Sequence, residues 1–188
     1  MKTNRKTLLS ISIVALLLSA CAGDKMMPEE TVPFGGPVSV AYAGELWQAL
    51  QSARLAGPAA IETKAYPGQH PHGSVLQLAD AMLTVNGITG PVIVKNNFGG
   101  EGVSVDNVTR DPSRYLIAVT VMYQRPGYDP DNNDWFWARY LPDGSLDKNS
   151  EGMALAGRVA KADPPGGCIA CHRAAPGGDL VFTHNRFQ

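Results

Sequence analysis

The chain has 188 residues, of which 44% are hydrophobic and 18% are charged, with 20 glycines and 14 prolines. This composition is typical of a compact, loop-rich protein and excludes a disordered chain, a collagen, a coiled coil and a multi-span membrane protein. The formal net charge is −1 and no lysine or arginine cluster is present, so nothing in the charge favours nucleic-acid binding. The length suits one domain.

The N-terminus has the pattern of a signal peptide. Residues 1–6 carry three basic side chains and no acidic one, and residues 8–20 form an unbroken run of apolar or small residues. This run is too short to span a bilayer, which takes about 20 residues. We therefore predict that residues 1–20 are removed when the chain is exported.

The end of this segment also predicts a lipid anchor. Leu18-Ser19-Ala20-Cys21 matches the lipobox of bacterial lipoproteins, in which the cysteine thiol is acylated and becomes the first mature residue. Ala22 follows instead of the aspartate of the inner-membrane retention signal, which favours the outer membrane and a domain facing the periplasm. The alternative is an ordinary cleaved signal peptide with Cys21 there by chance.

After the anchor, the sequence predicts a tether and then a domain. Residues 21–43 contain Met, Pro and Gly without a sustained period, which indicates a tether, and residues 44–188 are predicted to fold. Residues 44–57 place apolar side chains at helical spacing and end at Gly57-Pro58, which predicts an amphipathic helix.

Four short runs rich in Val, Ile, Leu and aromatic residues follow a turn-rich loop over residues 66–73. Clusters of Gly, Pro, Asn and Asp separate the runs, and their spacing suits antiparallel meander connections better than parallel crossovers. The predicted strands are 74–78, 91–97, 115–123 and 134–140. We therefore expect a mostly β (α+β) fold, an antiparallel β-sheet domain with a few helices.

Cys168-Ile169-Ala170-Cys171-His172 is a C-x-x-C-H motif, the attachment signature of c-type haem. Two thiols at this spacing can reach the two vinyl groups along one porphyrin edge, and the adjacent histidine can ligate the iron. A disulfide between them would close too short a loop to add much stability. The motif therefore predicts haem c bound through Cys168 and Cys171, with His172 as the iron ligand.

Three other interpretations of this motif are a thioredoxin-like redox pair, half of a zinc site, and chance. A redox pair needs a strand-to-helix setting, whereas Pro164-Pro165-Gly166-Gly167 precedes this motif. A zinc site needs a second pair of ligands, and the only other cysteine is Cys21. Export also favours c-type haem, which is attached outside the cytoplasm.

The position of the motif bears on the sixth iron ligand, because no Met follows His172. A methionine in an apolar run is more often core filler, and histidines in a Pro-rich loop more often lie at the surface or brace a turn. We therefore expect an open or weakly occupied distal site, which favours gas or small-molecule binding over electron transfer. The candidates for a sixth ligand are Met82, Met122, Met153, His70 and His72.

Several blocks resemble the cytochrome P-460 family, in order and spacing, over about residues 66–184. The most specific block is Asp134-Trp-Phe-Trp-Ala-Arg-Tyr140, because tryptophan is scarce. In a strand, Trp135 and Trp137 share one face and Phe136 lies on the other. These aromatic side chains are expected in the sheet core, in the wall of a haem pocket, or in both. The C-terminal haem motif is the second specific block. The others are Pro71–Gly73, Gly90–Lys95, Val119–Tyr123, Gly127–Pro130, Pro142–Gly144 and Asp179–Thr183.

The resemblance implies a mostly antiparallel domain, often a homodimer, with one five-coordinate haem c. Cytochrome P-460 enzymes oxidise hydroxylamine and carry a lysine covalently joined to the porphyrin, whereas the related cytochromes c′-beta bind nitric oxide or carbon monoxide without that link. Lys95 falls at the position of the cross-linking lysine. In an alternating strand Lys95 shares a face with Ile93, so it either snorkels to water or lies beside the porphyrin.

Two departures from the P-460 enzymes lower the case for hydroxylamine oxidation. Their distal arginine lies just ahead of the early strand, and residues 73–78 here contain none. The carboxylate that accepts protons in that reaction has no clear counterpart, with Glu101 and Asp106 as loop candidates. Asp134 and Asp179 are expected to cap or brace turns.

The sequence therefore predicts a periplasm-facing c-type haem protein that binds small nitrogen species or diatomic gases such as nitric oxide and carbon monoxide. The first alternative is a hydroxylamine-oxidising enzyme with a Lys95–haem cross-link, which passes electrons to another periplasmic cytochrome. The second is an electron-transfer cytochrome with an axial methionine.

Overall fold

A six-stranded antiparallel sheet carries the fold of the computed structural model, which describes residues 32–159 and 167–182. The strands follow one another as a meander in the order β1-β2-β3-β4-β5-β6, and the predicted fold class is confirmed. The strands are β1 (Tyr66–Pro67), β2 (Val75–Val85), β3 (Ile88–Phe98), β4 (Leu116–Gln124), β5 (Trp135–Tyr140) and β6 (Ala156–Gly157). The helices are α1 (Pro37–Ser52), α2 (Val105–Arg110), α3 (Pro112–Tyr115), α4 (Cys168–His172) and the 3-10 helix η1 (Pro130–Asn132).

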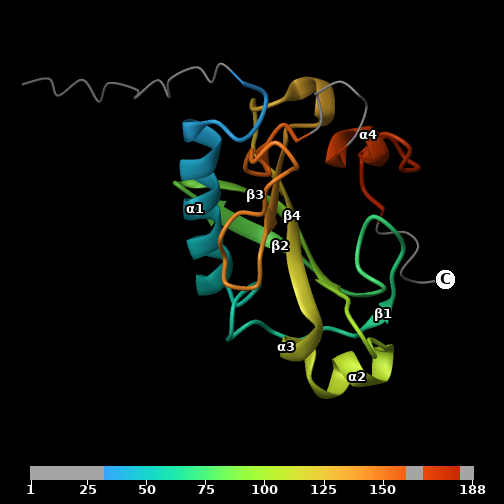
Figure 1. Cartoon of the computed structure of the whole chain (residues 1–188). Helices are drawn as coiled ribbons and strands as arrows, with labels where there is room; N and C mark the ends of the chain where they lie inside the picture. The colour runs from blue at the N-terminus through green and yellow to red at the C-terminus, as the bar shows by residue number, and fades with distance from the viewer. Residues whose placement is uncertain (1–31, 160–166, 183–188) are drawn as a thin grey trace, which may run out of the picture.

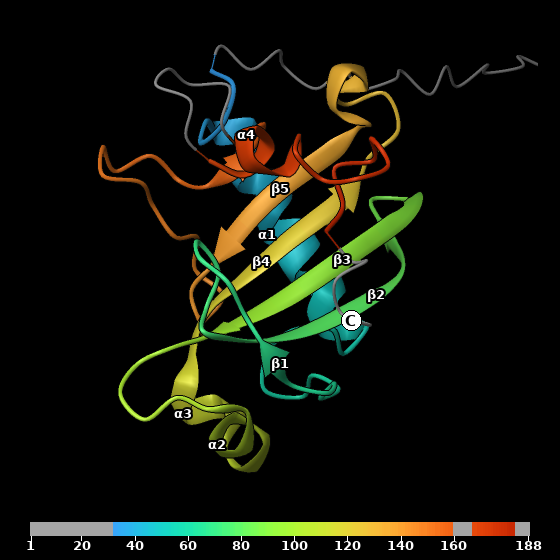
Figure 2. The same ribbon diagram turned by 90° about the vertical axis from the view of Figure 1, so that its right-hand side faces the viewer.

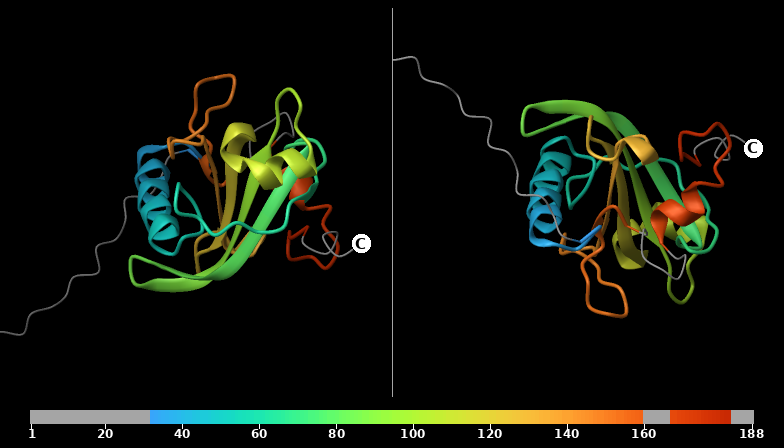
Figure 3. Two further views of the ribbon diagram at one scale, coloured as in Figure 1. Left: turned by 90° about the horizontal axis from the view of Figure 1, so that it is seen from below. Right: turned by 90° about the horizontal axis from the view of Figure 1, so that it is seen from above.

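Alternation along the strands divides the sheet into two faces. On β4, Val119 and Val121 point toward α1, whereas Thr120 and Met122 point to the opposite side. We call these sides the α1 face and the α4 face, because α1 covers the first and the segment with α4 covers the second (Figure 1). Views from below and above place the two helices on opposite sides of the sheet (Figure 3).

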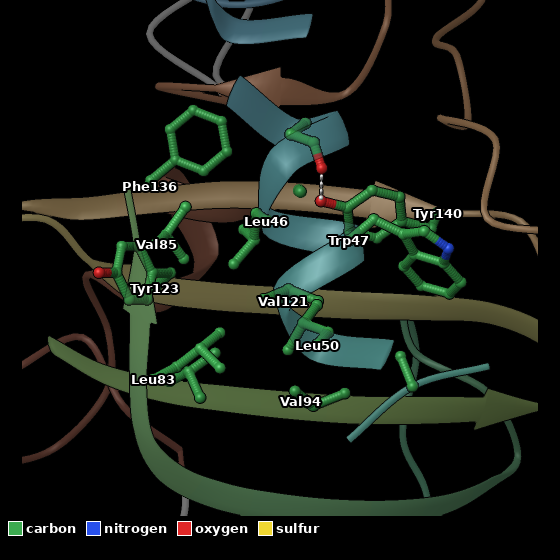
Figure 4. Close-up of a cluster of buried hydrophobic side chains, with 14 of the residues drawn as sticks. Leu46, Trp47, Leu50, Leu83, Val85, Val94, Val121, Tyr123, Phe136 and Tyr140 are labelled. Atoms are coloured by element: carbon green, nitrogen blue, oxygen red, sulfur yellow. Dashed lines mark hydrogen bonds between the residues drawn. The ribbon is translucent and has the colours of Figure 1, made fainter. Parts of the chain in front are cut away.

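The α1 face holds the larger core, in which aliphatic and aromatic side chains of α1 pack on β2–β5 (Figure 4). Leu46 and Leu50 of α1 are fully buried there. The Tyr140 hydroxyl donates a hydrogen bond to the Ala43 carbonyl at 2.8 Å, which joins β5 to α1. Burial of this apolar surface and the hydrogen bond together hold α1 against the sheet.

The helix α1 begins at Pro37, within the segment 21–43 that the sequence predicted as a tether. Proline suits the first turn of a helix, since its φ is already helical and its missing N–H has no partner there. Tyr42 is 2% exposed against the sheet, so burial stabilises this early start. The predicted boundary at residue 43 is therefore wrong, and the helix also ends earlier than predicted, at Ser52.

The strands β2 and β3 form a long hairpin, well beyond the predicted strands 74–78 and 91–97. Its turn is Asn86-Gly87, both with positive φ (51° and 78°), as a two-residue type I′ turn requires. The Asn-Gly pair was the available sequence signal for this hairpin. The predicted strands 115–123 and 134–140 agree within one residue with β4 and β5.

The helices α2 and α3 lie at one end of the sheet, away from α4 (Figure 2). The Ser104 side chain accepts a hydrogen bond from the Asn107 N–H at 3.1 Å and so caps α2. Val108 is fully buried in a small cluster with Phe98 and Tyr115, which fixes α2 to the sheet. Among the helices in the described residues, none is long and apolar enough to cross a membrane.

Candidate functional site

A cavity of about 820 Å³ lies on the α4 face. Its walls come from β2–β5, the loop after β1, α4 and residues 181–182. In Figure 2 the loop around β1 and α4 lie on the same side of the sheet. The volume is within the range of about 300–1,000 Å³ that is typical of small-molecule and cofactor sites.

The structure brings the predicted haem residues together at this cavity. Lys95 on β3 lines it, and so do Cys168, Cys171 and His172 on α4, although they are far from Lys95 in the chain. Cys21, the predicted lipidation site, lies outside the described residues, as does the predicted signal peptide.

His172 is 8% exposed and is held by contacts with the C-terminal segment and β5. Its Nδ1 lies 2.7 Å from the Leu180 carbonyl oxygen, so Nδ1 donates the hydrogen and Nε2 keeps its lone pair. The rings of Trp137 and Phe182 stand edge-on to it at 4.8 and 5.3 Å. Burial lowers the pKa of His172, which favours the neutral imidazole. This is the state of a metal-ligating histidine, whose second ring nitrogen usually donates to a carbonyl.

The carbonyl that orients His172 is itself held in place. Leu180 has a φ of 65°, a left-handed conformation that is uncommon for a branched residue. The neighbouring Asp179 carboxylate accepts a hydrogen bond from the Val181 N–H at 3.0 Å, and the Trp135 indole donates to the Asp179 carbonyl at 2.9 Å. The predicted turn-bracing role of Asp179 is therefore confirmed.

Asp134 also braces a turn, as predicted. Its two carboxylate oxygens accept hydrogen bonds from the N–H groups of Gly127 and Asp129, both at 3.0 Å. These bonds close the connection between β4 and β5 just ahead of Trp135, and so help to set the strand that carries the cavity wall.

The two thiols of α4 are both free, and Cys168 is partly buried whereas Cys171 is exposed. Burial raises the pKa of the Cys168 thiol to about 11. An apolar environment that raises the pKa is typical of an inert thiol, so it does not favour Cys168 as the reactive thiol of a thioredoxin-like pair. Ile169 is 1% exposed and packs against the core of the α4 face, which holds α4 on the sheet.

Lys95 lies on the α4 face, paired across the strands with Leu78 and Thr120. Val94 points into the α1 core while Ile93 and Lys95 face the cavity, which confirms the predicted alternation. Burial lowers the pKa of the Lys95 ammonium group. Within the part of the chain that is described, its Nζ has no hydrogen bond or ion pair, so the cavity contains the amine of a half-buried lysine that lacks a counter-charge.

His72, from the loop before β2, enters the same cavity. Its ring centroid lies 6.2 Å from that of His172, with the ring planes at 83°. Its Nδ1 is 2.9 Å from Oδ1 of Asn97, a fully buried residue. Burial and the nearby Lys95 ammonium group lower the pKa of His72 to about 4, so its ring is neutral near pH 7. His70, in the same loop, is exposed at the rim.

The methionine candidates for a sixth iron ligand separate by position. Met82 is 64% exposed and Met153 packs beside the core, and neither lines the cavity. Met122 does line it, but is 7% exposed and packed between Ile93 and Trp137 of the neighbouring strands. Its surroundings are those of a core residue.

Sequence reasoning missed an ion pair in the cavity wall. Arg139 stands in the same cross-strand row as Thr120 and Lys95, and its Nε donates to Asp147 Oδ2 at 2.7 Å. Both side chains line the cavity. Alternation was the available signal, since Arg139 is two positions beyond Trp137 on one strand and must share its face.

The two loop carboxylates that the sequence offered as proton acceptors lie elsewhere. Glu101 and Asp106 are both exposed, near α2, and neither lines the cavity. Among the described residues, Asp147 is the carboxylate in its wall, and it is engaged by Arg139.

The chemistry of the cavity fits a haem. A porphyrin is a flat apolar ring with two carboxylates on one edge. Apolar side chains supply much of the wall, and the buried Trp137 Nε1 has no hydrogen-bond acceptor among the described residues. Lys95 supplies positive charge for those carboxylates, and His172 supplies a neutral nitrogen ligand beside two free thiols.

Comparison with known proteins gives one match. A family model described as Cytochrome P460 matches residues 55–183. The matched span contains all six strands, the cavity loop and α4. No curated protein and no solved structure matches the chain.

Proposed function

The chain belongs to the cytochrome P460 family, which implies a haem cofactor with iron, and on that premise we propose that it is a c-type haem protein that binds diatomic gases or small nitrogen species. One observation carries the proposal. A single cavity with largely apolar walls gathers two free thiols and a neutral, oriented histidine from the C-x-x-C-H motif.

Attachment requires only the two cysteines. Each thiol, Cys168 and Cys171, would add across one vinyl group, with the sulfur bonded to one vinyl carbon and the thiol hydrogen on the other. No oxidant or reductant is consumed. The Nε2 lone pair of His172 would hold the iron, and the bound haem would supply a coordination position for a small ligand.

The walls of the cavity favour small neutral ligands. Leu78, Ile93 and Met122 present apolar surface and exclude water. Asp147 balances the charge of Arg139 at 2.7 Å, and a carboxylate of the bound haem would balance that of Lys95. Nitric oxide and carbon monoxide are neutral and small, and such a surface costs them little desolvation.

The optical spectrum of the purified ferrous protein, with and without carbon monoxide, tests this function. We expect an ordinary haem c Soret band that shifts on addition of the gas, because a ligand reaches the iron. A spectrum with a methionine–iron charge-transfer band and no response to carbon monoxide would contradict gas binding and indicate an electron-transfer cytochrome.

Lys95 favours a second candidate, hydroxylamine oxidation by a haem with a lysine cross-link. Lys95 is half-buried, its amine lacks a partner in the described residues, and burial lowers its pKa, so a larger share of the amine is in the nucleophilic neutral form. The new C–N bond would replace one porphyrin C–H bond and one lysine N–H bond, which releases two electrons and two protons. A peroxide would be the oxidant: it would take up these electrons and protons and be reduced to water, or to water and an alcohol.

The same purified protein decides between the two candidates. A strongly red-shifted Soret band, with tryptic peptides of Lys95 and Cys168–His172 still joined through the haem in mass spectrometry, would establish the cross-link. Separate peptides and an ordinary Soret band leave gas binding as the function. Lys95→Gln, which cannot form the bond, is the matched control.

We also propose that acylated Cys21 anchors the protein to the outer membrane, with the domain facing the periplasm. The family resemblance further suggests that the protein is a homodimer. A lipoprotein has several acyl chains, enough for stable anchoring, whereas one chain binds only marginally. Wild type should fractionate with membranes, and Cys21→Ser should appear in the soluble fraction after osmotic shock with the same haem content. Equal solubility of both would contradict the anchor.

A further inference from the structure

Two histidines from distant parts of the chain meet in the cavity. The ring centroids of His72 and His172 are 6.2 Å apart and the planes are nearly perpendicular, at 83°. A metal–nitrogen bond of about 2 Å puts the centroid of a bound imidazole about 3 Å from the metal. Two imidazoles on opposite sides of one iron would therefore have centroids about 6 Å apart, close to the separation observed here.

Asn97 sets the protonation of the His72 ring. Its Nδ2 donates to the Lys95 carbonyl at 2.8 Å and to Thr120 Oγ1 at 3.1 Å, which leaves Oδ1 facing His72 Nδ1 at 2.9 Å. An amide oxygen only accepts hydrogen bonds, so Nδ1 of His72 must donate and Nε2 keeps its lone pair. The backbone N–H of Gly73 donates to the same oxygen at 3.4 Å and supports this orientation.

The two rings are thus prepared in the same way. His172 donates Nδ1–H to the Leu180 carbonyl and His72 donates Nδ1–H to Asn97, so each has a free Nε2 lone pair. A hydrogen bond from the second ring nitrogen to an oxygen acceptor is the usual support of a histidine that binds a metal. The other two candidates for a sixth ligand near the cavity fit less well, because Met122 is packed as a core residue and His70 is exposed at the rim.

We infer that His72 is the second axial ligand of the iron that His172 holds, and that small ligands bind by displacing it. The inference rests on the proposed haem c attachment. In place of the open distal site expected from the sequence, His72 would close the distal site until it leaves the iron. Nε2 of His72 would leave the iron as the gas arrives. The apparent affinity for the gas then falls in proportion to the fraction of molecules that are open.

Spectroscopy and carbon monoxide binding test this inference on the haem-loaded protein. We expect wild type to be low-spin, with no methionine–iron charge-transfer band and with the highly anisotropic electron paramagnetic resonance signal of perpendicular imidazoles. His72→Ala should be high-spin and bind carbon monoxide at least about tenfold more tightly, as expected if about one wild-type molecule in ten is open. Its binding rate should rise linearly with gas concentration, whereas that of wild type should saturate.

Controls separate this inference from the proposed function. His70→Ala changes an exposed histidine of the same loop and should behave as wild type. His72→Phe keeps a ring without a nitrogen ligand, should also be high-spin with tighter carbon monoxide binding, and replaces His72→Ala in the test if the alanine variant does not fold. A high-spin wild type that matches both His72 variants overturns the inference, while covalent haem and gas binding would still support the function. Haem that is not covalently attached contradicts both.

Discussion

The double variant Cys168→Ala/Cys171→Ala is expected to lose all of its haem to acidified acetone, whereas wild type keeps its haem on the polypeptide. The reason is the number of thioether bonds: the described residues contain only these two cysteines, and both line the cavity. Each single variant retains one thiol and should hold its haem through one bond. Absorbance of the organic phase and of the protein pellet measures the result.

His172→Ala separates attachment from ligation in the same assay. It leaves both thiols in place and should keep haem bound to the chain, but its spectrum should lose normal axial ligation because the oriented Nε2 is gone. Clean extraction of haem from wild type would show that the motif does not attach it.

Phe136→Ala is expected to lower the free energy of unfolding by about 3–5 kcal/mol. Phe136 is fully buried on the α1 face, with its ring 4.9 Å from that of Tyr42 and 5.5 Å from that of Tyr128. Its removal leaves a cavity and ends both aromatic contacts. Urea unfolding followed by circular dichroism, with linear extrapolation, measures the change.

A surface substitution supplies the comparison. Ile61 is 56% exposed, and Ile61→Ala should change stability by no more than about 0.5 kcal/mol. Because Phe136 lies on the face opposite the cavity, folded Phe136→Ala should keep the wild-type haem spectrum. An equal loss of stability in both variants would show that Phe136 is not part of the core.

The sequence predicted the fold class and the strands β4 and β5 well, because these strands are dense in β-branched and aromatic residues that alternate between two buried faces. It missed most of β2, where the exposed Asp80 and Met82 interrupt the apolar pattern. The start of α1 was missed because the residues just after Pro37 show no apolar pattern of their own; the sheet that packs against them buries them and so stabilises the helix there.

Part of the candidate site could also be predicted. The C-x-x-C-H spacing is local and needs no fold to be recognised. Alternation correctly put Lys95 and Ile93 on one face, since that depends only on the period of a strand. The family resemblance then led to Lys95, and the cavity brings it to the thiols.

By itself, the sequence determined which residues are the candidates for the chemistry and which side of each strand they occupy, because spacing and period are properties of the chain. Only the tertiary structure decided which of these residues meet. The distance of 6.2 Å between His72 and His172, and the Arg139–Asp147 pair in the wall, depend on how a loop and α4 pack on one sheet face. That packing follows from burial of surfaces far apart in the chain, including those of Ile169 and Trp137 in one cluster, and no local pattern contains it.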